Sequence, residues 1–137
     1  DSLPQGCVLT NCDIIIKEDY STILDFHIEN HNDVTIVAAI NTKEIPYGIL
    51  QISDNGELKS IDEKPKLSYL INSGMYVLGN SALNLIPVNT RFDTTDLILS
   101  AKRHNLKVGV FPISENDWLD IGEWTNYKSI LLEAIKL

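Results

Sequence analysis

The fold class expected for this chain follows first from residues 6–13, Gly6-Cys-Val-Leu-Thr-Asn-Cys-Asp13. Residues 6–10 are short, apolar and bounded by Gly6 and Asn11, which predicts a buried strand of a mostly parallel sheet. Asp13 lies just past the end of that strand. Because functional sites in open α/β sheets gather at the carboxyl ends of strands, Asp13 is a candidate site residue by position alone.

Helix and strand patterns alternate along the rest of the chain. Strands are expected over residues 34–40, 71–78 and 108–112, and helices over 20–30, 81–86, 93–103 and 122–136. Ser21 is the candidate cap of the first helix, Pro87 stops the second, and Asp93 or Thr94 can cap the third. The last helix carries Trp124 and Tyr127 on an apolar stripe.

A β-hairpin is the most specific local pattern. Two strand-like segments, residues 47–53 and 57–61, flank an Asn55-Gly56 turn. The hairpin and the alternating helix and strand patterns together predict an α/β fold in one domain over residues 1–137. The expected architecture is a mixed, mostly parallel sheet flanked by helices, with an inserted hairpin.

Composition narrows the class of protein. The chain has 137 residues, 44% of them hydrophobic and 22% charged, which fits one compact domain with a core. Its 11 basic residues are scattered among 19 acidic ones, so a nucleic-acid partner is not expected. The sequence shows neither a membrane-spanning apolar run nor a signal-type segment, which favours a cytoplasmic protein without a membrane partner.

The cysteines and histidines do not indicate a disulfide or a zinc site. Cys7 and Cys12 are five residues apart around one strand, so their side chains should point to opposite faces, and both are expected to be small buried residues in a reducing compartment. His27 and His31 have a spacing that can share a metal on a helix. Their intervening sequence is not the zincin pattern, which favours a surface pair.

Five polar motifs interrupt the core pattern in a fixed order. They are Asn11-Cys-Asp13, Pro46-Tyr-Gly48, Glu63-Lys-Pro65, Asn72-Ser-Gly74 and Trp118-Leu-Asp120 with Gly122. In this order they resemble the sugar nucleotidyltransferases, the family that includes mannose-1-phosphate guanylyltransferases and glucose-1-phosphate thymidylyltransferases. The resemblance runs from about Val8 to the last helix and looks closest to bacterial guanylyltransferase-like members that activate sugars for surface polysaccharides or nonulosonic acids. It implies part of a Rossmann-like fold and transfer of a nucleotidyl group from a nucleoside triphosphate to a sugar 1-phosphate.

The resemblance implies that Asp13 and Asp120 are catalytic residues that bind Mg²⁺. Two convergent carboxylates suit this ion, which completes its octahedron with water and phosphate oxygens. In this chemistry the metal neutralises charge on the α-phosphate. From local sequence alone, Asp13 could instead end a strand and Asp120 could cap the final helix.

The resemblance also assigns substrate contacts. Lys64 would bind the sugar phosphate as a third catalytic residue, and Glu63 would accept a hydrogen bond from a sugar hydroxyl. The implied substrate-binding set is Tyr47, Gly48, Glu63, Asn72, Asp93 and Trp118. Each of these residues also has an ordinary alternative: Lys64 in a solvated loop, Gly48 in a turn, Asn72 at a strand end and Asp93 as a helix cap.

One family element has no counterpart in this chain. The family opens with a glycine-rich loop whose N–H groups hold the nucleotide triphosphate, and no comparable glycine cluster occurs here. The chain is therefore expected to be the C-terminal, sugar-phosphate-binding part of a longer enzyme, inactive alone, with the nucleoside triphosphate bound only by the full-length protein. Two alternatives stay open: a non-catalytic sugar-phosphate-binding or regulatory module, and a glycosyltransferase, although Asn11-Cys-Asp13 lacks the paired aspartates usual there.

Overall fold

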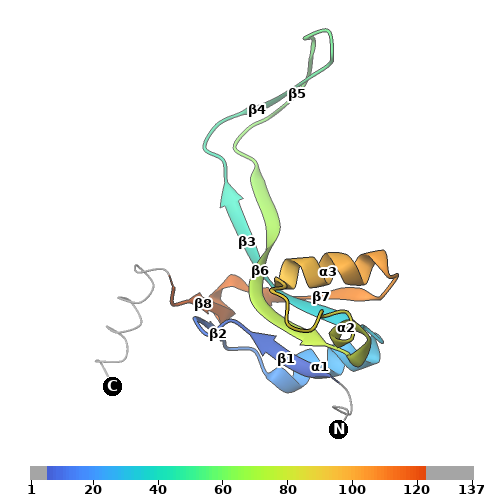
Figure 1. The fold of residues 1–137 in the computed structure, drawn as a ribbon. Coiled ribbons are helices and arrows are strands. Elements are labelled where there is room, and N and C mark those ends of the chain that lie inside the picture. The colour runs from blue at the N-terminus through green and yellow to red at the C-terminus, as the bar shows by residue number, and fades with distance from the viewer. Residues whose placement is uncertain (1–5, 123–137) are drawn as a thin grey trace, which may run out of the picture.

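A mixed four-stranded sheet organises the chain, and the computed structural model describes residues 6–122 of it (Figure 1). The strand order is β1 (Cys7–Thr10), β6 (Lys66–Leu78), β3 (Val34–Glu44) and β7 (Val108–Ser114). β6 runs antiparallel to both of its neighbours, and only β3 and β7 are parallel. The mixed α/β fold is confirmed, but the expectation of a mostly parallel sheet is wrong for the described residues. The reason is the hairpin, because β6 follows it at once and returns beside β3 in the opposite direction.

Helices cover both faces of the sheet (Figure 1). α1 (Tyr20–Glu29) lies on one face over a core cluster that includes Ile23, Val37 and Met75. α2 (Asn80–Leu83) and α3 (Thr94–Arg103) lie on the other face. Because successive strand residues point to opposite faces, the same strands supply both clusters. The expected layered architecture is confirmed.

The helix termini differ in detail from the sequence pattern. Asp19, not Ser21, caps α1, and its carboxylate accepts a hydrogen bond of 2.9 Å from the backbone N–H of Ser21. Asp93 occupies the N-cap position of α3 as expected, but its side chain makes no capping hydrogen bond. α2 is shorter than the expected helix over 81–86 because the N–H groups of Leu85 and Ile86 bond carbonyls three residues back, as in a tight last turn.

β3 and β6 continue beyond the sheet as a projecting arm (Figure 1). The two strands stay paired as far as Glu44 and Lys66, so both are longer than expected. The arm ends in the hairpin of β4 (Ile49–Ile52) and β5 (Leu58–Asp62). The N–H of Gly56 donates to the Ser53 carbonyl at 2.9 Å across the Asn-Gly turn, which confirms the hairpin.

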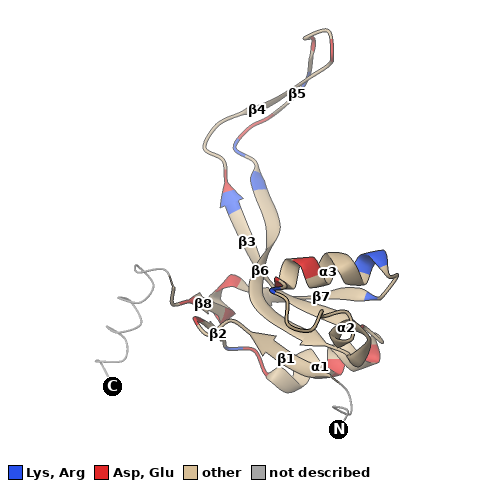
Figure 2. Cartoon of the chain, viewed as in Figure 1, with Lys and Arg blue, Asp and Glu red and all other residues tan. Residues whose placement is uncertain are grey.

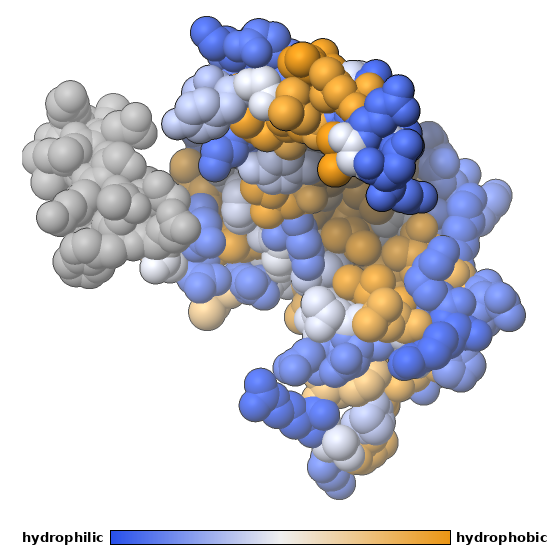
Figure 3. Space-filling model, turned by 90° about the horizontal axis from the view of Figure 1, so that it is seen from above, coloured by the Kyte–Doolittle hydropathy of each residue, from blue (hydrophilic) through white to orange (hydrophobic). Residues whose placement is uncertain are grey.

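The tip of the arm has one apolar face. Leu50 lies opposite Ile61 and Ile52 lies opposite Leu58, so all four side chains share a face and each is more than half exposed. Figure 3, which looks down on the arm, shows apolar side chains grouped among polar ones. A hairpin alone is marginal in water, so the β3–β6 pairing at its base carries this arm.

His27 is buried, which corrects the expectation of a surface histidine pair. It falls four residues after Ile23, on the side of α1 that faces the sheet. Its Nδ1 lies 2.8 Å from the Thr35 hydroxyl, which also accepts a hydrogen bond of 3.1 Å from Asn32. His31 lies beyond the end of α1 and is exposed. The two histidines therefore do not share a helix face.

Burial of His27 predicts a pH-dependent stability. Burial lowers the pKa of His27 from its usual 6.5, and the charge of Asp33 opposes this in part. The unfolded chain then binds a proton more readily than the folded chain. The free energy of unfolding should therefore fall as the pH drops from about 6.5 through the folded pKa, by at most about 1.4 kcal/mol per pH unit.

Urea unfolding from about pH 8 to about pH 5 measures this slope. His27→Gln should flatten the dependence, and the matched variant His31→Gln should leave it unchanged. An equal slope in both variants would assign the pH dependence to other groups.

The remaining expectations concern the cysteines and the C-terminal helix. Both cysteines are free thiols, as expected, but Cys7 is only partly buried and Cys12 is exposed because it lies in the turn after β1. Three of the four residues of β1 are exposed, which corrects the expected burial of that strand. The helix expected over 122–136, with Trp124 and Tyr127, lies outside the described residues apart from Gly122. Within residues 6–122, no helix is long and apolar enough to cross a bilayer.

Candidate functional site

Two short strands bring Asp13 and Asp120 together. β2 (Ile14–Ile16) pairs antiparallel with β8 (Trp118–Asp120), and Ile14 lies opposite Asp120. Beyond the last pair, the N–H of Ile121 donates to the Asp13 carbonyl at 2.7 Å. Two aspartates that are far apart in the sequence therefore become neighbours.

The two carboxylates face the same point beside Gly122. A Cβ built on Gly122 would lie 3.0 Å from Oδ2 of Asp13 and 3.1 Å from Oδ1 of Asp120. Oδ1 of Asp120 also accepts a hydrogen bond of 2.9 Å from the Gly122 N–H, as an N-cap side chain would. A larger residue at position 122 would fill the space between the two carboxylates.

This donor set fits Mg²⁺ better than zinc. Asp13 is exposed and Asp120 is partly exposed, so water and phosphate oxygens can complete a coordination shell around an ion. Within residues 6–122, no group of three or more histidine, cysteine or acidic side chains is placed to hold a metal. Zinc sites use three or four nitrogen, sulfur or carboxylate ligands, whereas Mg²⁺ binds through one or two carboxylates.

A bulge in β6 contacts the two segments that carry the aspartates. The register of β3 and β6 shifts after Val37, whose partner is Met75, because Ala38 pairs with Asn72. The two β6 residues between those pairs are therefore extra, and one of them is Gly74, with a φ of 85°. Bulges of this kind occur next to active sites, where they redirect the chain.

The bulge holds both aspartate-bearing segments. The Gly74 carbonyl accepts a hydrogen bond of 3.0 Å from the backbone N–H of Asn11, two residues before Asp13. The Ser73 carbonyl accepts a hydrogen bond of 3.1 Å from the indole N–H of Trp118, in the strand that ends at Asp120. The spacing of the aspartates therefore depends on this bulge.

Asn72 stabilises the bulge with its own side chain. Its amide donates to the Tyr76 hydroxyl at 2.7 Å and accepts a hydrogen bond of 3.2 Å from the Gly74 N–H. These bonds give Asn72 a structural role near the aspartates. Its sugar contact stays a prediction.

Four of the other expected site residues lie on the arm: Tyr47, Gly48, Glu63 and Lys64. The Glu63 carboxylate lies over Gly48, where a Cβ would be 2.7 Å from Oε2. Lys64 is exposed and has a φ of 49°. Figures 1 and 2 show the arm pointing away from the acidic residues near β2 and β8, with basic residues where β3 ends and β6 begins. The structure thus keeps Lys64 apart from the aspartates, and its role stays a prediction.

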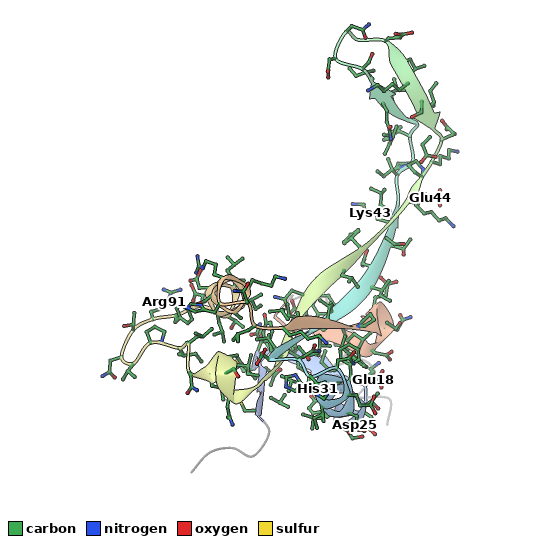
Figure 4. All side chains as sticks on the ribbon, turned by 90° about the vertical axis from the view of Figure 1, so that its right-hand side faces the viewer. Glu18, Asp25, His31, Lys43, Glu44 and Arg91 are labelled. Carbon is green, nitrogen blue, oxygen red and sulfur yellow. The ribbon has the colours of Figure 1, made fainter. Side chains whose placement is uncertain are left out.

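Asp93 lies neither at the Asp13–Asp120 pair nor on the arm, but at the start of α3. It is exposed, and its carboxylate is 3.6 Å from the guanidinium of Arg91, which Figure 4 labels. An exposed pair of this kind contributes little to stability. Asp93 does not join the aspartate cluster, and its substrate contact also stays a prediction.

Sequence reasoning missed the roles of Asn11, Ser73 and Gly122. All three residues lie in motifs named from the sequence, so their positions were marked although their contacts were not. Ser73 contributes a backbone carbonyl to Trp118, and a backbone contact of this kind leaves no signal in residue identity.

The motif order and the geometry agree with a match to a protein-family model. The model for nucleotidyl transferases matches residues 2–136. This chain belongs to the nucleotidyl transferase family. The resemblance identified from the five motifs is confirmed.

Several sugar-1-phosphate adenylyl- and guanylyltransferases are similar to this chain. A glucose-1-phosphate adenylyltransferase of Ruminiclostridium cellulolyticum is 40% identical over 85 residues, which cover 58% of this chain and 20% of that protein. The same enzyme of Bacillus subtilis is 29% identical over 130 residues, 87% of this chain and 34% of that protein. A mannose-1-phosphate guanylyltransferase catalytic subunit beta of Drosophila melanogaster is 31% identical over 80 residues, 57% of this chain and 22% of that protein.

Solved structures support the fold. HddC from Yersinia pseudotuberculosis superposes with a TM-score of 0.59 at 20% identity, over 89% of this chain and 52% of its own. This likeness confirms the α/β fold class. The chain spans about half the length of that structure and, at most, about a third of the three curated relatives.

Proposed function

We propose that this chain is the sugar-phosphate part of an enzyme that transfers a nucleotidyl group from a nucleoside triphosphate to a sugar 1-phosphate. The observation that carries the proposal is the convergence of Asp13 and Asp120 on one point beside Gly122. The names of the relatives support it, because they are sugar-1-phosphate adenylyl- and guanylyltransferases.

In the proposed reaction, an oxygen of the sugar phosphate attacks the α-phosphorus of the triphosphate. The bond from that phosphorus to the oxygen bridging the β-phosphate breaks, and pyrophosphate leaves with the electron pair. The attacking phosphate is already ionised, so the chain needs no general base. Asp13 and Asp120 would hold Mg²⁺, which supplies positive charge to the α-phosphate.

Lys64 would offset repulsion between the two anionic substrates through its ammonium group. This role requires Lys64 to approach the aspartates, so the arm would have to bend toward the β2–β8 pair when the sugar phosphate binds. The nucleotide would be bound by other parts of the fold, because residues 1–137 contain no glycine-rich phosphate loop. HddC, which has been solved with GMP-PN, spans about twice the matched length.

Pyrophosphate release tests the proposal. The chain alone, supplied with Mg²⁺ and a matrix of sugar 1-phosphates and nucleoside triphosphates, should release none above background. The product of the complete reading frame should release pyrophosphate with one substrate pair. In that protein Asp13→Asn should lower kcat/KM by about 100-fold or more.

Asp25→Asn is the matched control, because Asp25 is an exposed carboxylate on α1 (Figure 4). It should change kcat/KM by less than about threefold. Equal effects of the two variants would contradict the proposed role of Asp13. Hydrolysis of nucleotide sugars without pyrophosphate chemistry would favour a glycosyltransferase instead.

A further inference from the structure

The arm leaves the sheet at a defined point on β3. Up to Ile40, β3 has a strand on each side, and the pair Ile40–Ser114 is its last with β7. From Asn41 to Glu44, β3 pairs with β6 and no longer with β7 (Figure 1). A two-stranded ribbon twists more strongly than a wider sheet does. A bend of the arm relative to the sheet is therefore easiest between Ile40 and Asn41.

A side-chain hydrogen bond crosses that point. The side-chain amide of Asn41, the first residue of the ribbon, donates to Oε2 of Glu115 at 2.9 Å. Glu115 is the first residue of η1 (Glu115–Asp117), the short 3-10 helix that follows β7 directly. The two residues are 74 positions apart in the sequence. The bond therefore connects the base of the arm to a distant segment of the chain.

η1 leads from this bond to the aspartate pair. At its start, the Ser114 hydroxyl accepts a hydrogen bond of 3.2 Å from the N–H of Asn116. At its end, the Asp117 carbonyl accepts a hydrogen bond of 2.9 Å from the N–H of Lys17, the residue after β2. β8 begins at the next residue and ends at Asp120. A displacement at the start of η1 would thus be transmitted through one short, anchored helix to β8.

The two strands of the arm are held together just beyond the Asn41 bond. The hydroxyl groups of Thr42 and Ser68 lie 3.0 Å apart and share a hydrogen bond across the strands. Backbone pairing continues past them to the last pair of β3 with β6, which includes Lys66. The base of the arm can therefore move as one body, so a change at Asn41 should reach Lys43 and Lys66.

We propose that Asn41 and Glu115 are positioning residues that couple the arm to the metal site. The position of Asp120 then depends on the position of the arm, and by reciprocity an ion bound at Asp13 and Asp120 shifts the arm. This inference rests on the proposed function, in which Lys64 on the arm must approach the two aspartates. Because the coupling cannot exceed the contribution of one hydrogen bond, it should change affinities by at most about tenfold.

A magnesium titration of this chain, followed by NMR, tests the coupling without measuring catalysis. Mg²⁺ is diamagnetic, so a shift of an amide resonance far from the ion reports a change of conformation. Figure 4 labels Lys43 on the arm, which points away from the β2–β8 pair. Mg²⁺ should move the amide resonances of Lys43 and Lys66 along the same binding curve as that of Gly122.

Three substitutions separate the hydrogen bond from the charge of Glu115. Asn41→Ala and Glu115→Ala both remove the bond, so the shifts on the arm should be lost and the Kd for Mg²⁺ should rise about two- to tenfold. Glu115→Gln removes the charge but keeps a carbonyl oxygen that can accept from Asn41, so it should retain the shifts on the arm. Because Glu115 is exposed and Asn41 only partly buried, Tm should change little in all three variants.

Thr42→Val is the matched control. It removes the hydrogen bond to Ser68, which lies on the arm but does not contact η1. The shifts of Lys43 and Lys66 on Mg²⁺ addition should therefore persist in this variant. Their loss would mean that any weakening of the arm abolishes the response, which would overturn the specific role of Asn41.

Three further results would overturn the coupling while Gly122 still responds to Mg²⁺. They are arm resonances that stay in place in the unmodified chain, shifts that persist in Asn41→Ala, and equal losses in Glu115→Gln and Glu115→Ala. The last result would assign the effect to the charge of Glu115. Failure of the proposed function has a different signature, because the Gly122 resonance itself would then not respond to Mg²⁺, and the coupling would fall with the metal site.

Discussion

Replacing Gly74 by alanine should lower the free energy of unfolding by about 1–3 kcal/mol and displace the segment before Asp13. Gly74 has a φ of 85°, a conformation that side chains with a Cβ rarely adopt. A Cβ there would also lie 2.7 Å from the side-chain amide nitrogen of Asn11, which is closer than contact allows. The variant therefore combines backbone strain with a clash beside the site.

Gly56→Ala is the control for strain alone. Gly56 has a nearly identical φ of 83° in the hairpin turn, and a Cβ there would have no neighbour within 4 Å. Urea unfolding gives the stability of both variants, and the amide chemical shifts of Asn11 and Asp13 report displacement. If Gly74→Ala cost no more than Gly56→Ala and left those shifts in place, the bulge would not position the aspartates.

Local patterns predicted most of the fold, because each element carries its own signal. The apolar periodicity of α1 and α3 and the Asn55-Gly56 turn each arise within a few neighbouring residues. The pairing of β2 with β8 was not predicted, because three residues in each strand give too short a pattern and their register depends on contacts between distant segments. The direction of β6 was missed for a similar reason, since pairing is a property of two strands.

The candidate site was likewise predicted in part. The resemblance to a family marked Asp13 and Asp120, and the structure brings their carboxylates to one point. The resemblance could not show that Lys64 lies on an arm that points away from the two aspartates, because the order of motifs contains no distances. The resemblance also could not show the structural role of Asn72, whose side-chain amide hydrogen-bonds to Tyr76 and to Gly74 in the bulge.

Mn²⁺ should bind between Asp13 and Asp120, and replacing either aspartate by asparagine should weaken binding by about tenfold or more. Mn²⁺ is a paramagnetic substitute for Mg²⁺, so it should broaden the amide resonances of Asp13, Asp120 and Gly122 first. Excess Mg²⁺ should reverse the broadening. Binding to the chain alone should be weak, with a Kd on the order of millimolar, because two carboxylates bind the ion without triphosphate oxygens.

If Asp13 and Asp120 bind the same ion, the effects of their substitutions should not be additive. This distinguishes a shared site from two independent surface carboxylates. Once Asp13→Asn has removed one ligand, adding Asp120→Asn should cost much less than Asp120→Asn alone, because the two side chains act on the same ion. Asp25→Asn should leave the broadening at Gly122 unchanged, since Asp25 is an exposed carboxylate on α1. Additive losses from the two aspartates would show that each binds the ion separately, and tight binding by the chain alone would mean that it holds a complete metal site without the rest of the fold.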